Sequence, residues 1–419
     1  MQPTDLIILS NGPGEVATWV RPVVKMLPQV FGQQMSQIRI SVLLSPCPHS
    51  TGKEAVIAAS YSEVDRVLPA SNFLAFLLWG HTPENWQWYQ NGLVLFLGGD
   101  QFYPVAISKR LGYSSLVYAE WDARWYRLID RFAAVNQQVI ERVPQSYRQK
   151  FTVVGDLMVD AASEVERSVI TTEEEHPLIG LLVGSKPAKL FQGLPLCLAI
   201  AEQIQQHLPQ ARFIIPVAPT LDLTAISDYA DPQHNPLIKV LGNVEGTLVM
   251  DGATQLPYLR TSGGTKIELI TKFPAYENLV KCQICLTTVG ANTAELTALK
   301  VPMMVMLPTQ QLDAMRSWDG IPGIFANLPG LGSVFAKLIN WFILKQGRLF
   351  AWPNIWAKKE IVPELVGKLQ PEIVASLVLD YLAHPHKLQI MRNHLSAVRG
   401  KTGAAKQIAD IIKQEIIKT

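Results

Sequence analysis

Cysteine is scarce in this sequence, which has four in 419 residues: Cys47, Cys197, Cys282 and Cys285. So few cysteines exclude a fold held together by several disulfides. Cys282 and Cys285 form one CxxC pair, but a metal site needs a second pair or nearby histidines, and neither is close in the sequence. The surrounding run "QICLTTV" has the apolar pattern of a buried strand. We therefore expect core thiols, no metal site, and a reducing, cytoplasmic location.

Charge and long apolar runs are scarce too. Charged residues make up 17% of the chain, and the formal net charge is +2. Nucleic-acid backbones are bound by clustered cations, so no nucleic-acid partner is expected. No apolar run reaches the ~18 residues of a membrane-spanning helix, and no basic region precedes the first apolar run, as a signal peptide requires. The sequence therefore predicts neither a membrane span nor a signal peptide.

Apolar residues, at 48%, are abundant enough for two cores, and they fall in short runs that alternate with helical segments. The first set of predicted strands is 5–10, 38–45, 93–99, 114–120, 132–136 and 151–156. After a polar segment at 168–177 a second set follows: 178–184, 212–218, 246–252, 283–289 and 302–308. These runs are apolar on both faces, which is typical of parallel sheets. The pattern predicts an α/β protein with two Rossmann-like domains facing a cleft, followed by three helices from Pro371.

Ligands of open parallel sheets bind beyond the carboxyl ends of the strands. In the first predicted domain, "SNGPGEVATW" follows the first strand with Asn11, Gly12 and Gly14, which allow close backbone approach, and then Glu15. Glu15 can hydrogen-bond a sugar hydroxyl or act as a base, or it simply complements a helix dipole. Asp100, in "FLGGDQFYP", can accept a proton from a hydroxyl or serve as a helix cap.

Two loops of the second predicted domain fit a diphosphate. In "LVGSKPAKLFQGL", Gly184 and Ser185 lie between a strand and a helix, with Lys186 beside them. In "TTVGANTAELTALK" the candidates are Thr288, Gly290, Asn292, Thr293 and Glu295. Backbone N–H groups there can hold phosphate, and Glu295 can accept ribose hydroxyls. The alternative is an ordinary capped core helix.

A further stretch, "AWPNIWAKKEIVPEL", sets Asn354, Lys359 and Glu360 among apolar residues. Polar groups inside an apolar run often serve a partner, although an interdomain contact would explain them equally.

This last stretch resembles a late motif of the lipid-A-disaccharide synthases, PN-L-A-G-R-E-(L/V)-V-P-E-L. In the same order along the chain, "GGDQF" is similar to the family's aspartate-bearing strand end and "VVGDLMVDA" to its (V/I)-G-H-P-(L/M)-x-D-A. "LLVGSKPAKL" resembles its L-L-P-G-S-R-x-x-E-(I/V), and "TTVGANTAELTALKVPMMV" its S-G-T-A-T-L-E-x-A-L-x-x-x-P-M-V-V. Lys186 and Lys359 replace two family arginines, so a phosphate contact there lacks the planar bidentate fork.

The resemblance implies a GT-B fold with an acceptor-binding domain at 1–167, a nucleotide-sugar-binding domain at 168–398, and a helix at 399–419 that crosses back to the first domain. It implies inverting, metal-independent transfer of a sugar, with UDP-sugar as the expected donor, to a lipid-like or small hydroxyl acceptor. No separate cofactor is expected. Asp100 or Glu15 would be the base, and Lys186 with the helix at Asn292 would stabilise the leaving diphosphate. The alternatives are a nucleotide-sugar epimerase of GT-B shape and a non-catalytic nucleotide-sugar-binding protein.

Residues 70–90 hold an aromatic-rich segment that is too short to span a bilayer. We expect it to form a lip beside the acceptor site, with Phe76 and Trp79 contacting the acceptor and the membrane surface. Peripheral attachment to the inner face of a membrane follows, as the resemblance also implies. The alternative is a helix buried against the sheet.

Overall fold

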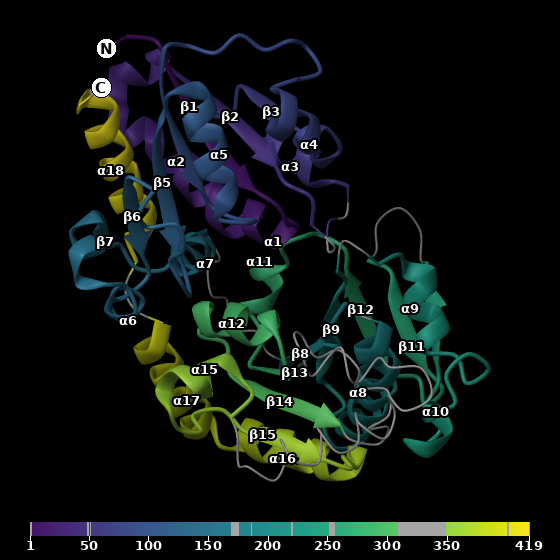
Figure 1. Cartoon of the computed structure of the whole chain (residues 1–419). Helices are drawn as coiled ribbons and strands as arrows, with labels where there is room; N and C mark the ends of the chain where they lie inside the picture. The colour runs from purple at the N-terminus through teal and green to yellow at the C-terminus, as the bar shows by residue number, and fades with distance from the viewer. Residues whose placement is uncertain are drawn as a thin grey trace, which may run out of the picture. The chain divides into compact units, whose positions relative to one another are not determined.

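The computed structural model describes residues 2–47, 50, 52–168, 176–185, 187–218, 221–250, 256–308, 349–399 and 402–418. The chain divides into two compact units (Figure 1): unit 1 is Met1–Glu164 with Gly400–Thr419, and unit 2 is Val165–Arg399. The predicted domains differ from these units by a few residues at each limit, and the roles assigned to them stay predictions.

Unit 1 is built on a parallel sheet with the strand order β3-β2-β1-β4-β5-β6-β7. Its strands are β1 (Thr4–Ser10), β2 (Ile38–Leu44), β3 (Arg66–Leu68), β4 (Asn91–Phe96), β5 (Ser114–Ala119), β6 (Arg131–Ala134) and β7 (Phe151–Val153). Its helices are α1 (Pro13–Glu15), α2 (Arg21–Phe31), α3 (Glu54–Ala59), α4 (Ala70–Trp79), α5 (Phe102–Leu111), α6 (Gln137–Glu141), α7 (Leu157–Ser168) and α18 (Ala404–Lys418). All seven residues of β1 are buried, as expected for a parallel strand covered on both faces.

The last helix returns to unit 1, as the sequence predicts. Figure 1 shows α18 lying along α2, and its buried isoleucines Ile408 and Ile412 join the core that contains Leu6 of β1. Asp160 of α7 fixes its beginning, because the carboxylate accepts the N–H groups of Gly403 at 2.6 Å and Ala405 at 2.7 Å. An acidic group at that point also suits the positive end of the helix dipole.

Unit 2 contains an eight-stranded sheet in the order β10-β11-β12-β9-β8-β13-β14-β15. Its strands are β8 (Leu178–Leu182), β9 (Arg212–Pro216), β10 (Gly246–Val249), β11 (Tyr258–Thr261), β12 (Lys266–Ile270), β13 (Ile284–Thr288), β14 (Met303–Pro308) and β15 (Glu364–Gly367). The helices are α8 (Pro187–His207), α9 (Leu223–Tyr229), α10 (Leu237–Val240), α11 (Tyr276–Leu279), α12 (Ala291–Ala298), α15 (Trp352–Ala357), α16 (Pro371–Ala383) and α17 (Pro385–Arg399). The pairings β10–β11 and β11–β12 are antiparallel, and the other pairings are parallel.

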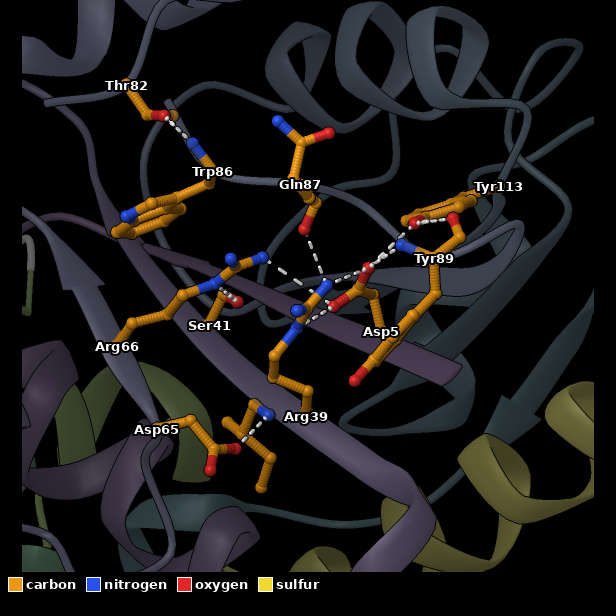
Figure 2. Close-up of polar contacts among 11 residues, drawn as sticks. Asp5, Arg39, Ser41, Asp65, Arg66, Thr82, Trp86, Gln87, Tyr89 and Tyr113 are labelled. Atoms are coloured by element: carbon orange, nitrogen blue, oxygen red, sulfur yellow. Dashed lines mark hydrogen bonds and ion pairs between the residues drawn. The ribbon is translucent and has the colours of Figure 1, made fainter. Parts of the chain in front are cut away.

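The amino ends of β1, β2 and β3 carry a network of charged and aromatic side chains (Figure 2). Asp5 is fully buried, and its carboxylate accepts hydrogen bonds from Arg39 Nε at 2.7 Å and from the Tyr113 hydroxyl at 2.9 Å. Arg66 lies over Trp86, 4.3 Å from the ring centroid. The network lies at the edge of the sheet opposite to the carboxyl ends of the strands, so we assign it to stability.

The structure also shows where the cysteines lie and whether any described helix could span a membrane. The thiols of Cys282 and Cys285 are buried, as predicted, and burial raises the pKa of Cys197 to about 12. Within the described part of the chain, no helix combines the length and apolarity needed to cross a membrane.

Candidate functional site

The loops after β1 and β4 meet in unit 1. β1 is bordered by β2 on one side and by β4 on the other, so the strand order reverses between β1 and β4. Ligand sites of open parallel sheets form at such a reversal. A Cβ atom on Gly98, just after β4, would lie 2.7 Å from Asn11 Oδ1 and 3.3 Å from Glu15 Cγ. The predicted residues Asn11 and Glu15 therefore pack together at the expected position.

Gly12 and Gly14 differ in the space that a side chain would have at each position. A Cβ atom on Gly12 would lie 2.5 Å from Glu15 Oε2, so glycine lets that carboxylate rest against the backbone. At Gly14 a Cβ atom would meet no described heavy atom within 4 Å. The close approach of the Glu15 carboxylate to the backbone therefore requires glycine at residue 12. A contact between Gly14 and a ligand stays a prediction. The chain continues into a π-helical turn, Val16–Val20, a form frequent at functional sites.

Asn11 carries a buried polar atom that no residue in the described ranges satisfies. Its Oδ1 is buried without a hydrogen-bond partner among the described residues, and the same is true of Ser10 Oγ. Leaving a buried polar group unpaired costs about 1–3 kcal/mol. A ligand hydroxyl beside β1 would supply the missing partner.

Asp100 is held from two sides. Its Oδ1 accepts the Phe102 N–H at 2.8 Å, which caps the start of α5. Its Oδ2 lies 3.5 Å from Arg124 Nη1, and the Asp100 side chain is 46% exposed. The two predicted roles are therefore compatible, because the cap uses one oxygen and orients the other toward solvent and Arg124.

The predictions for Phe76 and Trp79 need correction. Phe76 is fully buried and packs against Trp88 with ring centroids 5.6 Å apart, so it belongs to the core and cannot contact an acceptor. Trp79 is exposed, but it ends α4, whose last turn is bound by Arg110 from the last turn of α5. Helices that follow parallel strands run back toward the amino ends of those strands, so Trp79 lies away from the loops after β1 and β4.

Other aromatic side chains, which the sequence analysis missed, border Asp100. Phe102 and Trp125 are exposed and lie with ring centroids 5.3 Å apart. Gln101 orders the loop that carries Trp125, because its Oε1 accepts the Arg124 N–H at 2.7 Å and its Nε2 donates to Asp122 O at 3.0 Å. The tryptophans within "EWDARW" were the available sequence signal.

In unit 2 the loops after β8 and β13 meet in the same way. β8 is bordered by β9 on one side and by β13 on the other, so the strand order reverses between β8 and β13. Gly184 has φ +88°, and a Cβ atom there would lie 3.3 Å from Thr288 Oγ1. Ser185 is exposed next to the first turn of α8. Lys186, the predicted cation, lies outside the described residues.

Lys189, which the sequence analysis did not select, connects these two loops. It projects from the first turn of α8, and its Nζ donates to Val289 O at 2.5 Å, directly after β13. A Cβ atom on Gly290 would lie 2.8 Å from the same nitrogen. The site therefore contains an ammonium group even without Lys186.

The residues predicted on α12 divide into two groups. Asn292 and Glu295 are half-buried, and their contact with a ligand stays a prediction. Thr293 is fully buried, and its hydroxyl donates to Gly290 O at 2.9 Å and accepts the Trp352 N–H at 3.2 Å. The prediction of a direct ligand contact is wrong for the Thr293 side chain, which instead ties α12 to α15.

Asn354 was also predicted to bind the ligand, and the structure gives it another role. It is fully buried, with Nδ2 donating to Val362 O at 2.8 Å and to Glu364 Oε1 at 2.7 Å, while Oδ1 accepts the Val362 N–H at 2.9 Å. The prediction is wrong because these hydrogen bonds occupy the amide. Lys359 and Glu360 are exposed in the loop that Asn354 orders, so their contact with a ligand stays a prediction.

Comparison with known proteins gives no matching family model. A curated lipid-A-disaccharide synthase of Anaeromyxobacter sp. (strain K) is 30% identical over 102 residues, covering 22% of this chain and 27% of that protein. Another, from Syntrophus aciditrophicus, is 23% identical over 248 residues, covering 58% of this chain and 51% of that protein. The chain is distantly related to the lipid-A-disaccharide synthases. Its matches span about half the length, or less, of these curated relatives.

Solved structures establish the fold of this distant synthase relative. A UDP-GlcNAc 2-epimerase from Neisseria meningitidis, bound to UDP-GlcNAc, aligns with a TM-score of 0.53 at 14% identity, over 98% of this chain and 100% of that one. The likeness and the two sheets of the chain together identify the GT-B fold that the resemblance implies. At that identity the likeness carries no statement about activity.

Proposed function

We propose that the chain is a glycosyltransferase that moves a sugar from a nucleotide-sugar, with UDP as the nucleotide, to a hydroxyl acceptor. This proposal rests on the site in unit 2, where Gly184, Thr288 and Lys189 lie together at the reversal of the strand order. N–H groups at the start of a helix and an ammonium suit a diphosphate. The relationship to the lipid-A-disaccharide synthases supports transfer as the reaction.

In the proposed reaction, unit 1 binds the acceptor and unit 2 the donor. Asp100 takes the proton of the acceptor hydroxyl while its oxygen forms the bond to the anomeric carbon. The bond from that carbon to the diphosphate oxygen breaks, with inversion, and the nucleoside diphosphate leaves. N–H groups and the Lys189 ammonium stabilise the charge on the leaving group. Asn11 and Glu15 hold acceptor hydroxyls.

A nucleotide-sugar 2-epimerase is the second candidate, favoured by the full-length fold likeness to such an enzyme. The two reactions differ in their products. Transfer releases free UDP and a glycosylated acceptor, whereas epimerisation returns a nucleotide-sugar with altered stereochemistry at C2.

The test begins with UDP-, GDP- and ADP-sugars in a thermal-shift screen, because a ligand that binds only the folded state raises the melting temperature. The products formed from the stabilising sugar are then analysed, with and without lipid and soluble acceptors. We expect stabilisation by a UDP-sugar and acceptor-dependent release of UDP. An epimerised donor would replace this proposal with the second candidate, and binding without turnover would make the chain a non-catalytic binding protein.

The acceptor that we propose is lipid-like, and it implies attachment to a membrane surface. Two observations support this: Leu74, Leu78 and Trp79 form an exposed apolar face on α4, and Phe102 with Trp125 exposes aromatic area beside Asp100. Tryptophan favours the headgroup region of a bilayer, and apolar faces dip into its acyl boundary.

We expect the native chain to sediment with liposomes and the Leu74→Ser/Leu78→Ser/Trp79→Ser variant to remain largely in the supernatant. These side chains are exposed, so the variant should fold, which circular dichroism checks. The matched control is Ile373→Ser/Ile390→Ser, at two exposed apolar side chains of unit 2, which leaves the α4 face and the Phe102–Trp125 pair intact. A native protein that stays in solution with both anionic and neutral liposomes would rule out the membrane surface and favour a soluble acceptor.

A further inference from the structure

Lys189 occupies a position that joins two neighbouring strands of unit 2. It lies in the first turn of α8, five residues after Gly184, and its Nζ donates to Val289 O at 2.5 Å. β8 and β13, the strands that precede these loops, pair in parallel where the strand order reverses. The ammonium is thus fixed at the carboxyl ends of the two strands, where such sheets bind ligands.

Glycine makes room for this side chain on both loops. Gly290 has φ +144°, and a Cβ atom there would lie 2.8 Å from Lys189 Nζ. Gly184 has φ +88°, and its Cβ would lie 3.0 Å from Lys189 Cδ. Both backbone conformations are rare for other residues. The two loops are therefore shaped around the lysine stem and its charged end.

A second, independent observation at this point is the hydroxyl of Thr288. The residue is only 7% exposed, and its Oγ1 has no hydrogen-bond partner among the described residues. This oxygen would lie 3.3 Å from a Cβ atom on Gly184, so it faces the same loop as the lysine stem. A buried hydroxyl in a native protein ordinarily has a partner. A ligand atom that accepts a hydrogen bond would give the Thr288 hydroxyl its partner.

We infer that Lys189 and Thr288 bind the diphosphate of the nucleotide donor, together with the N–H groups at the start of α8. This inference deepens the proposed function and rests on it. Phosphate oxygens accept hydrogen bonds from an ammonium, a hydroxyl and N–H groups alike. In the motif that "LLVGSKPAKL" resembles, the position of Lys189 carries glutamate, so the charge of the side chain is reversed here.

Paired titrations with UDP and uridine test this assignment, because the two ligands differ only by the diphosphate. Lys189→Met keeps the length and apolar stem of the side chain and removes its charge. We expect it to weaken UDP binding about 10- to 100-fold, the size of a charge-assisted hydrogen bond, and to leave uridine binding unchanged. Lys189→Arg should recover part of the loss, and Thr288→Val should weaken UDP binding alone. The matched control is Lys239→Ala, at an exposed lysine of unit 2.

The outcomes separate this inference from the proposed function. A folded Lys189→Met protein that binds UDP as the native chain does would overturn the assignment and leave the proposed function standing. An equal loss of UDP and uridine binding would also overturn it, because the lysine would then only support the loops. A native chain that binds neither ligand would end both proposals.

Discussion

Asp100→Asn is expected to lower turnover by about 100- to 10,000-fold, the contribution typical of a positioned general base. The asparagine amide oxygen can still accept the Phe102 N–H that Asp100 Oδ1 accepts at 2.8 Å, so the start of α5 stays capped. The ion pair with Arg124 is lost, but such an exposed pair contributes no more than about 1 kcal/mol. The measurement is the initial rate of UDP release from the sugar donor, together with the unfolding midpoint.

Glu15→Gln is the matched comparison, because it removes the other candidate base without changing the size of the side chain. We expect it to raise KM for the acceptor more than it lowers kcat, since Glu15 packs with Asn11 where acceptor hydroxyls are proposed to bind. If Asp100→Asn keeps most of its rate while Glu15→Gln loses it, Glu15 is the base and Asp100 is only a helix cap.

The central strands of both sheets could be predicted because they are apolar on both faces, as in β1 and β13. The missed strands lack that pattern. β3 has three residues and begins with Arg66. In β12 the buried Ile267 and Leu269 alternate with Lys266 and Glu268, the pattern of a strand with one solvated face. An alternation rule applied to the region around residues 258–270 would have found β12.

Glycines after predicted strands mark loops that the structure brings together where the strand order reverses, and the selected side chains Asn11 and Glu15 lie at one of these places. The role proposed for Lys189 depends on the pairing of β8 with β13, which lie about a hundred residues apart and whose adjacency local sequence does not encode. The prediction for Asn354 was wrong because its hydrogen-bond partners lie within the chain. A polar residue in an apolar run signals either a ligand or a buried internal partner, and here Glu364 and the Val362 backbone are the partners.

The composition of the aromatic-rich segment at 70–90 does not show which face of its helix is buried. In α4 nearly every side chain is apolar, so no face is marked as the buried one. The structure buries Phe73 and Phe76 and exposes Leu74 and Leu78. Which face of such a helix contacts the sheet is decided by tertiary packing, and the sequence analysis selected a core residue as a surface one.

The largest expected effect on stability comes from Asp5, at the centre of the network in Figure 2. Its fully buried carboxylate accepts two hydrogen bonds from Arg39, at 2.7 and 3.0 Å, and one from the Tyr89 N–H at 2.7 Å. Arg66 Nη2 lies 3.7 Å from the same carboxylate. One buried anion therefore faces two arginines whose side chains are 23% and 16% exposed.

The pKa shifts in the network show what Asp5 does for its neighbours. The hydrogen bond to Asp5 raises the pKa of Arg39 despite its partial burial. Burial lowers the pKa of Arg66, and the charge of Arg39 lowers it further, while Asp5 opposes both. Burial raises the pKa of the Tyr113 hydroxyl, and the neighbouring Asp5 adds to this, so the phenol stays a donor to the carboxylate. Without Asp5, two partly buried like charges would face each other, and Asp65 would remain as an acidic neighbour of Arg66.

Asp5→Ala is therefore expected to lower the free energy of unfolding of unit 1 by about 3–5 kcal/mol, the cost of removing one partner of a buried ion pair. Asp5→Asn keeps the shape and can still accept one hydrogen bond, so its loss should be smaller. It also provides a measurement if the alanine variant does not fold. Urea unfolding is followed by tryptophan fluorescence, to which Trp86 and Trp88, the two rings that stack on Arg66, contribute among the ten tryptophans of the chain. The matched control is Asp122→Ala, whose exposed carboxylate lies 3.5 Å from Arg124 and should change stability by less than about 1 kcal/mol. If both Asp5 variants unfold within about 1 kcal/mol of the native chain, the arginines find solvent when Asp5 is gone, and the network contributes little to stability.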